Sequence, residues 1–143
     1  MLKETMITFN SYTDFDLDQK KKHKDWLSFV ITNENFNQGD LAFVFCNDSY
    51  LLDLNLKFLS HNTLTDVITF NYNVGRQING DICISCDRVA ENASKYKTSF
   101  SEEIARVMVH GVLHLCGYKD STEQEKIEIR GKENFYLSEL FNR

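Results

Sequence analysis

Two histidines separated by three residues stand in the part of this sequence where chemistry is easiest to infer. If this segment is helical, His110 and His114 lie one turn apart on the same face, so both imidazoles project to one side. Gly117 is suited to the left-handed turn that ends a helix, and Asp120 follows where the chain can return toward the two rings. These residues predict a site in which His110, His114 and Asp120 bind one divalent metal ion, with zinc as the expected ion.

A metal site of this kind has a defined chemical use. Three protein ligands leave a fourth coordination position open for water, as in catalytic zinc sites. The ion lowers the pKa of that water toward about 7 and so supplies hydroxide at neutral pH. A single histidine on an apolar helix is more often a hydrogen-bonded core residue, but the pair with a glycine turn and an aspartate favours the metal site. The pattern therefore predicts a metal-dependent hydrolase.

The spacing of these residues is shared in outline with the metzincin proteases. Those enzymes carry a glutamate directly after the first histidine, and it serves as their general base. In this sequence that position is Gly111. Because the peptidase mechanism would lack its proton acceptor, the sequence excludes a metzincin protease.

One long helix must position the two histidines. Ser99 and Glu102 fit a capping box at its start, and Ser101 is an alternative cap. The helix is apolar on nearly all sides, so we expect it to be buried. Its apolar residues are Ile104, Val107, Met108, Val109, Val112, Leu113 and Leu115.

Strands and helices alternate ahead of this helix. We expect strands over 5–9, 41–46, 66–72 and 80–85, and further helices over 17–31, 47–59, 87–95 and 122–140. Residues 37–40 are expected to form a turn and 73–79 a loop, whose short length makes the two strands around it antiparallel. The predicted fold is α/β, a small mixed sheet of about four strands with a buried central helix carrying the metal-binding histidines, in a single domain over 1–143.

Composition and charge exclude several other classes of protein. The chain has 143 residues, of which 42% are hydrophobic and 26% charged, so it is neither disordered nor collagen-like. No apolar run approaches the roughly 18 residues that a membrane helix needs, and the first residues do not resemble a signal peptide. The net charge of −5 argues against a protein that relies on nonspecific attraction to phosphates. We expect a cytoplasmic protein without membrane association.

Several motifs resemble the YbeY family of endoribonucleases and rRNA maturation factors. Residues 110–118 read HGVLHLCGY, and the family signature is HGxLHLxGYDH. Residues 65–70 are similar to its TDVLSF strand, 80–85 to its GDIxI strand, and 54–55 stand at its LN pair. The resemblance implies a zinc-dependent, single-strand-specific endoribonuclease acting in rRNA 3′-end maturation and ribosome quality control. It also implies rRNA and the small ribosomal subunit as partners.

The sequence departs from the family pattern at two positions. The family's third metal ligand is usually histidine, and Asp120 is aligned with it; an aspartate can bind zinc through oxygen. The family's catalytic arginine is replaced by Leu59. His61 and Lys57 are candidates for the missing positive charge, and His61 ranks first because it lies beyond the predicted helix. Two alternative functions stay open: another metal-dependent hydrolase acting on a small molecule, or a non-enzymatic ribosome assembly factor with a structural metal.

Three other features have more than one interpretation. The basic run over 20–24 is either a solvated helix face or a contact for the RNA backbone. Asp66 either orients a ligand histidine or bonds the backbone at a strand end. Cys83 and Cys86 have C-x-x-C spacing, but the first lies inside a predicted strand, which favours buried, inert thiols. The last predicted helix offers Ile127, Phe135, Leu137 and Leu140 for packing and is assigned no chemistry.

Overall fold

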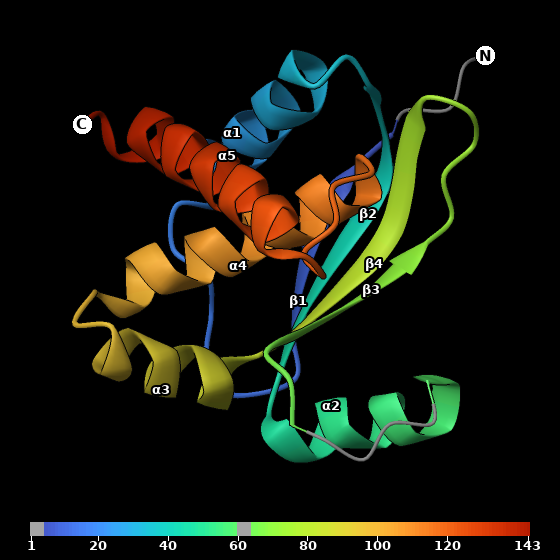
Figure 1. Cartoon of the computed structure of the whole chain (residues 1–143). Helices are drawn as coiled ribbons and strands as arrows, with labels where there is room; N and C mark the ends of the chain where they lie inside the picture. The colour runs from blue at the N-terminus through green and yellow to red at the C-terminus, as the bar shows by residue number, and fades with distance from the viewer. Residues whose placement is uncertain (1–4, 60–63) are drawn as a thin grey trace.

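A mixed sheet of four strands forms the centre of the computed structural model, which describes residues 5–59 and 64–143 (Figure 1). The strands are β1 (Ile7–Ser11), β2 (Asn37–Cys46), β3 (Val67–Asn71) and β4 (Gln77–Ser85), in the order β1-β2-β4-β3. β1 and β4 both run parallel to β2, and β3 runs antiparallel to β4. The predicted fold class and the antiparallel pair are confirmed.

Helices cover both faces of this sheet. In Figure 1, α1 (Lys20–Asn33), α3 (Cys86–Lys95), α4 (Phe100–Leu115) and α5 (Glu123–Phe141) lie on one side. The opposite side carries α2 (Asp48–Leu54), which continues into the short π-helical turn η1 (Asn55–Leu59). Within the described ranges, no helix combines the length and the apolar character needed to cross a membrane.

The main core lies between the sheet and α4. Ile82 and Ile84 of β4 contribute to it, whereas Cys83 between them packs with Leu51 of α2 on the other face, as alternation along a strand requires. α4 comes so close to the sheet that a Cβ built on Gly111 would lie 2.8 Å from Ile82 Cγ2. The predicted buried central helix is therefore confirmed, and a glycine is needed where it crosses β4.

Two expected irregular segments are in fact strand. The turn predicted over 37–40 is wrong, because these residues open β2, whose register with β4 shifts between Gln38 and Leu41. Gly39 lies in this irregularity, where a Cβ would overlap the side chain of Asn79. The loop predicted over 73–79 is too long, because β4 begins at Gln77. The polar residues and the glycine over 37–40, which suggested a turn, accommodate a β-bulge in β2 instead.

The inner face of α5 agrees only in part with the predicted one. Leu137 and Leu140 are buried as predicted, whereas Ile127 and Phe135 are 65% and 48% exposed, so their assignment to packing is wrong. The inward stripe also includes one charged side chain. Its members are Ile129, Glu133, Tyr136, Leu137 and Leu140.

Candidate metal centre

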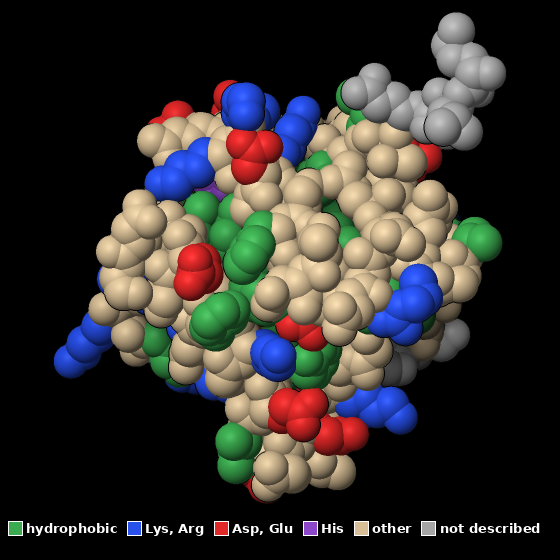
Figure 2. Space-filling view, turned by 90° about the horizontal axis from the view of Figure 1, so that it is seen from above, with side chains coloured by type: hydrophobic (Ala, Val, Ile, Leu, Met, Phe, Trp, Pro, Cys, Tyr) green, Lys and Arg blue, Asp and Glu red, His purple; other side chains and the backbone are tan. Residues whose placement is uncertain are grey.

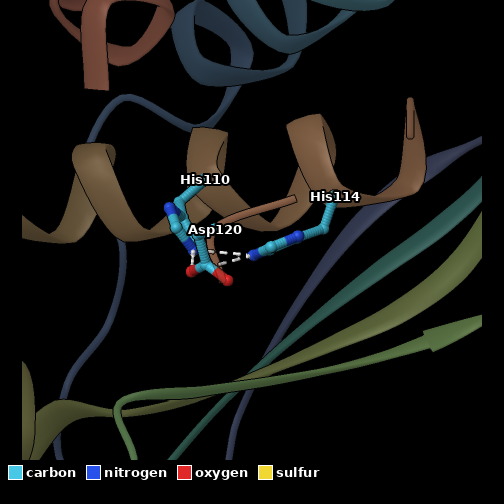
Figure 3. A group of neighbouring side chains, drawn as sticks. All are labelled: His110, His114 and Asp120. Atoms are coloured by element: carbon cyan, nitrogen blue, oxygen red, sulfur yellow. Dashed lines mark hydrogen bonds and ion pairs between the residues drawn. The ribbon is translucent and has the colours of Figure 1, made fainter. Parts of the chain in front are cut away.

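α4 and the turn after it position the three predicted ligands. Ser99 caps α4 by accepting a hydrogen bond from the backbone N–H of Glu102. At the other end, Gly117 takes a φ of +103°, the left-handed conformation expected of it. The chain then turns back so that Asp120 faces both histidine rings, which project from one side of α4 (Figure 3).

The three side chains converge on a common point. His110 Nε2 and His114 Nε2 lie 3.3 and 3.5 Å from Asp120 Oδ2, and the two Nε2 atoms lie 2.9 Å from each other. One ligand atom from each residue falls within 4.8 Å of the others, so this group could hold a metal ion. All three side chains keep some exposure, so the group is accessible to solvent.

The hydrogen bonds of the two Nδ1 atoms leave both Nε2 atoms available to bind a divalent cation together with Asp120. His110 Nδ1 donates to Glu133 Oε2 at 2.6 Å, and His114 Nδ1 donates to the carbonyl oxygen of Tyr118 at 2.9 Å. A neutral imidazole that donates through Nδ1 carries its lone pair on Nε2. Two such lone pairs and a carboxylate oxygen face one another here, an arrangement that a cation between them would stabilise.

Glu133 is a functional residue that the sequence analysis missed, and the prediction that the last helix carries no chemistry is corrected. Its second oxygen accepts a hydrogen bond from Arg106 at 2.9 Å. Burial alone would raise the pKa of Glu133, but the hydrogen bond and charge of His110, the hydrogen bond from Arg106 and the charge of Arg130 lower it overall. Glu133 is thus a buried anion that holds His110 in one tautomer. The sequence signal that could have identified Glu133 is its charge at a position of α5 where the other inward residues are apolar.

Protons and a metal ion compete for His110. Burial alone would lower the pKa of His110, but the hydrogen bond and charge of Glu133 and the charge of Asp120 raise it overall. Because a ligand imidazole must be unprotonated at the binding nitrogen, metal affinity at this centre falls as the pH falls.

Two hollows open on either side of the centre. The first, of about 310 Å³, lies between α4 and α5 and contains His110 and Asp120 in its wall. The second, of about 540 Å³, is lined by both histidines and Asp120 together with residues of η1 and β3. His110 and Asp120 therefore line both accessible spaces.

Of the two candidates for the missing positive charge, the structure describes Lys57 but not His61. Leu59, at the family's arginine position, lines the second hollow. Lys57 is exposed on η1 and is absent from the described residues that line either hollow. His61 lies outside the described residues. The ranking of His61 above Lys57 stays a prediction.

The structure bears on the interpretations left open for Asp66 and the cysteines. Glu133, not Asp66, forms the hydrogen bond to His110 Nδ1, while Asp66 lies just before β3 and lines both hollows together with His110. A role of Asp66 in orienting His110 stays a prediction. Cys83 is buried in β4, and burial raises the pKa of Cys83 and of Cys86 to about 11, so both thiols stay protonated at neutral pH.

The basic run over 20–24 belongs to the first turns of α1. Lys20 and Lys21 are exposed and pair with Asp16 and Asp25, both at 2.9 Å. These ion pairs describe a solvated helix face. Contact of this run with RNA stays a prediction.

Comparisons with known proteins identify the family. A family model described as endoribonuclease YbeY matches residues 6–141. Proteins named endoribonuclease YbeY from Flavobacterium psychrophilum and Amoebophilus asiaticus are 48% and 45% identical, covering 90% and 96% of this chain and 92% and 94% of their own length. The solution structure of a Thermotoga maritima protein has the same fold, with a TM-score of 0.67 at 24% identity over 96% of this chain and 90% of that one. The chain belongs to the YbeY endoribonuclease family.

Proposed function

We propose that this protein is a metal-dependent endoribonuclease that cleaves single-stranded RNA in the maturation of rRNA 3′ ends and in ribosome quality control. His110, His114 and Asp120 hold one divalent ion, and zinc suits their two imidazoles and one carboxylate. Membership of the YbeY family supports the reaction and the RNA substrate. The small ribosomal subunit in the cytoplasm is the proposed setting.

One observation carries this proposal. The Nε2 atoms of both histidines and a carboxylate oxygen of Asp120 converge, while each Nδ1 is already occupied by an acceptor. A structural histidine pair in a core has no need for this arrangement. A site with three protein ligands and an open side is typical of catalytic rather than structural zinc.

The residues around the ion have separable tasks. When bound, the ion supplies a Lewis acid that activates water and neutralises charge on phosphate oxygens. Glu133 and the Tyr118 carbonyl fix the orientation and tautomer of the two rings, so the ligands need little reorganisation. The two hollows flanking the ligands give room for the chain on both sides of the bond that breaks.

A nuclease assay with a matched variant tests the proposal. Wild type and His114→Ala are purified side by side and incubated with a labelled RNA that has single-stranded and duplex segments. The wild type is expected to cut the single-stranded segments only, and both a chelator and His114→Ala should abolish cutting. Equal cleavage by wild type and His114→Ala would identify a contaminating ribonuclease and contradict the proposal.

The assembly-factor alternative has its own test at the family's arginine position. Leu59 lines the second hollow, so an arginine there would reach the space beside the ligands. Leu59→Arg is expected to raise turnover, because a second positive group stabilises charge that develops on the phosphate oxygens. No gain in a folded variant, together with an inactive wild type, would favour a non-enzymatic factor.

A further inference from the structure

The hollow between α4 and α5 has a basic rim. Arg130 and Lys126 of α5 line it, and each side chain is 56% exposed. Each forms one long ion pair within α5, at 3.6 Å from Arg130 to Glu133 and 3.8 Å from Lys126 to Glu123. Because both pairs are long and both cationic side chains are more than half exposed, each cation can also contact an anion that enters the hollow.

The acidic groups of the same hollow are recessed and largely compensated. Glu133 is only 4% exposed and is engaged by Arg106 and His110. Glu103 is also buried, and burial is the main reason that its pKa is raised, as it is for Asp66. An entering anion thus meets the positive rim before the buried carboxylates of the hollow, and the exposed carboxylate of Glu123 lies beside Lys126 at the rim itself.

An exposed aromatic ring completes the wall of the hollow. Tyr96 follows α3, lines the hollow and is 59% exposed. Aromatic rings beside cations are the usual platform for single-stranded nucleic acid, because every base has a face that stacks. A base held in a duplex is not free to stack in this way.

Of the two hollows beside the predicted ligands, only the one between α4 and α5 has Lys or Arg among the described residues that line it. The net charge is −5, so RNA must be held by a local group of cations rather than by the overall field. On the face shown in Figure 2, basic and acidic side chains of the described residues are interspersed. The second hollow is lined, besides the metal ligands, by Asp66 and by uncharged residues of the described chain: Asn55, Leu59, Thr65, Val67, Ile68 and Thr69.

We propose that the hollow between α4 and α5 binds one nucleotide of single-stranded RNA next to the bond that is cut. The phosphate lies on Arg130 and Lys126, and the base stacks on Tyr96. The hollow of about 310 Å³ is at the lower end of the size range of small-ligand pockets. This inference rests on the proposed function and adds to it the side of the metal centre on which the substrate is held.

Binding of a phosphorothioate oligouridylate, which resists cleavage, tests the subsite. Its affinity for the metal-loaded protein is measured by fluorescence anisotropy at several salt concentrations. Arg130→Ala with Lys126→Ala removes the rim charges. Arg76→Ala with Arg143→Ala removes the same charge from exposed positions that line neither hollow, and serves as the comparator. The rim pair is expected to weaken binding about tenfold and to reduce the salt slope by about 0.7 for each phosphate that the variant no longer neutralises, with a clearly smaller effect for the comparator.

The aromatic contact is tested at Tyr96 itself. Tyr96→Leu is expected to weaken binding at least about fivefold, whereas Tyr96→Phe keeps the ring and should bind like wild type. Cleavage assays with the same variants should show a raised KM with kcat largely kept, because the subsite binds the substrate away from the reacting atoms.

The outcomes separate this inference from the proposed function. Wild type that cuts RNA while the rim pair and the comparator lose affinity equally would overturn the subsite alone. Tyr96→Leu that binds as tightly as wild type would overturn the stacked base. A wild type that neither binds nor cuts RNA would overturn the subsite together with the proposed function.

Discussion

Glu133 Oε2 lies 2.6 Å from His110 Nδ1, joining α5 to the ligand-bearing helix α4. The same carboxylate accepts a hydrogen bond from Arg106 at 2.9 Å, so its position is fixed from two sides. A carboxylate behind a ligand histidine sets the tautomer and raises the basicity of the nitrogen that binds the metal. α5 is therefore part of the metal centre although it supplies no ligand.

Substitution of Glu133 should weaken metal binding without removing a ligand. Glu133→Gln keeps the size of the side chain but loses its charge, and metal affinity is expected to fall about 10- to 100-fold. Competition with a chromogenic chelator measures this affinity. Glu139→Gln, at a position on the same helix away from the ligands, is the matched control and should bind like wild type. Equal affinity in both variants would show that Glu133 has only a structural role.

The ligand set predicts different results for two substitutions. His114→Ala removes an imidazole and should lose the ion, whereas Asp120→His replaces one competent ligand with another and should keep it. Elemental analysis of protein purified without added metal measures the content of each variant. Retention of a full complement of metal by His114→Ala, in a folded protein, would place the ion elsewhere.

Two glycines should respond to alanine in opposite directions. A Cβ added at Gly111 would lie 2.8 Å from Ile82 Cγ2. A Cβ added at Gly131 would have no atom of the described residues within 4 Å, apart from its chain neighbours and the backbone of its own helix. Gly111→Ala should lower the free energy of unfolding by about 1–2 kcal/mol through overpacking. Gly131→Ala, on the exposed side of α5, should raise it by about 0.5–1 kcal/mol through helix propensity. Denaturant unfolding measures both.

A double-mutant cycle tests the physical cause at Gly111. Ile82→Ala removes the side chain that an alanine at 111 would meet. The combined variant is expected to be more stable than the sum of the two single effects predicts, because the clash is absent from it. Additive effects would show that the destabilisation in Gly111→Ala does not arise from contact with Ile82.

Glu34 links α1 to the turn beyond α4 and gives a pH-dependent contribution to stability. Its carboxylate accepts hydrogen bonds from the hydroxyls of Tyr118 and Tyr136 and pairs with Lys132. Burial alone would raise the pKa of Glu34, but the two tyrosines and Lys132 lower it overall from its ordinary value near 4.5. The stabilisation is therefore fully present above pH about 4.5 and is lost as the pH falls through the lower folded-state pKa.

The variant Glu34→Gln measures how much the charged Glu34 carboxylate contributes to stability. Near neutral pH the variant should be less stable than wild type by about 2 kcal/mol, because it loses hydrogen bonds to a charged acceptor. The difference in the free energy of unfolding should shrink as the pH falls below 4.5. A difference that is independent of pH between neutral and acid would contradict the assigned charge of Glu34.

Local sequence features predicted that His110, His114 and Asp120 would meet, because all three lie within a short stretch of chain. His110 and His114 are fixed by helix periodicity, and Gly117 fixes the turn that brings Asp120 back. The antiparallel β3–β4 pair and the buried character of α4 are likewise local properties, since a short connection and an apolar surface on all sides determine them.

Features that depend on distant packing were missed. Glu133 is 23 residues from His110 in sequence, so only the tertiary contact between α4 and α5 shows its role. The segment 37–40 has the composition of a turn, but it pairs with β4, and Gly39 lies in the β-bulge between the two strands. The exposure of Ile127 and the burial of Ile129 follow from how α5 docks against its neighbours, which no single window of sequence contains.

The proposed activity requires one divalent ion at His110, His114 and Asp120. The activity of metal-stripped protein against single-stranded RNA, measured as zinc is returned in known amounts per chain, tests this requirement. Activity is expected to rise in proportion to added ion and to level off at one ion per chain, with no recovery in His114→Ala. Full activity in protein shown to be free of metal would contradict the account.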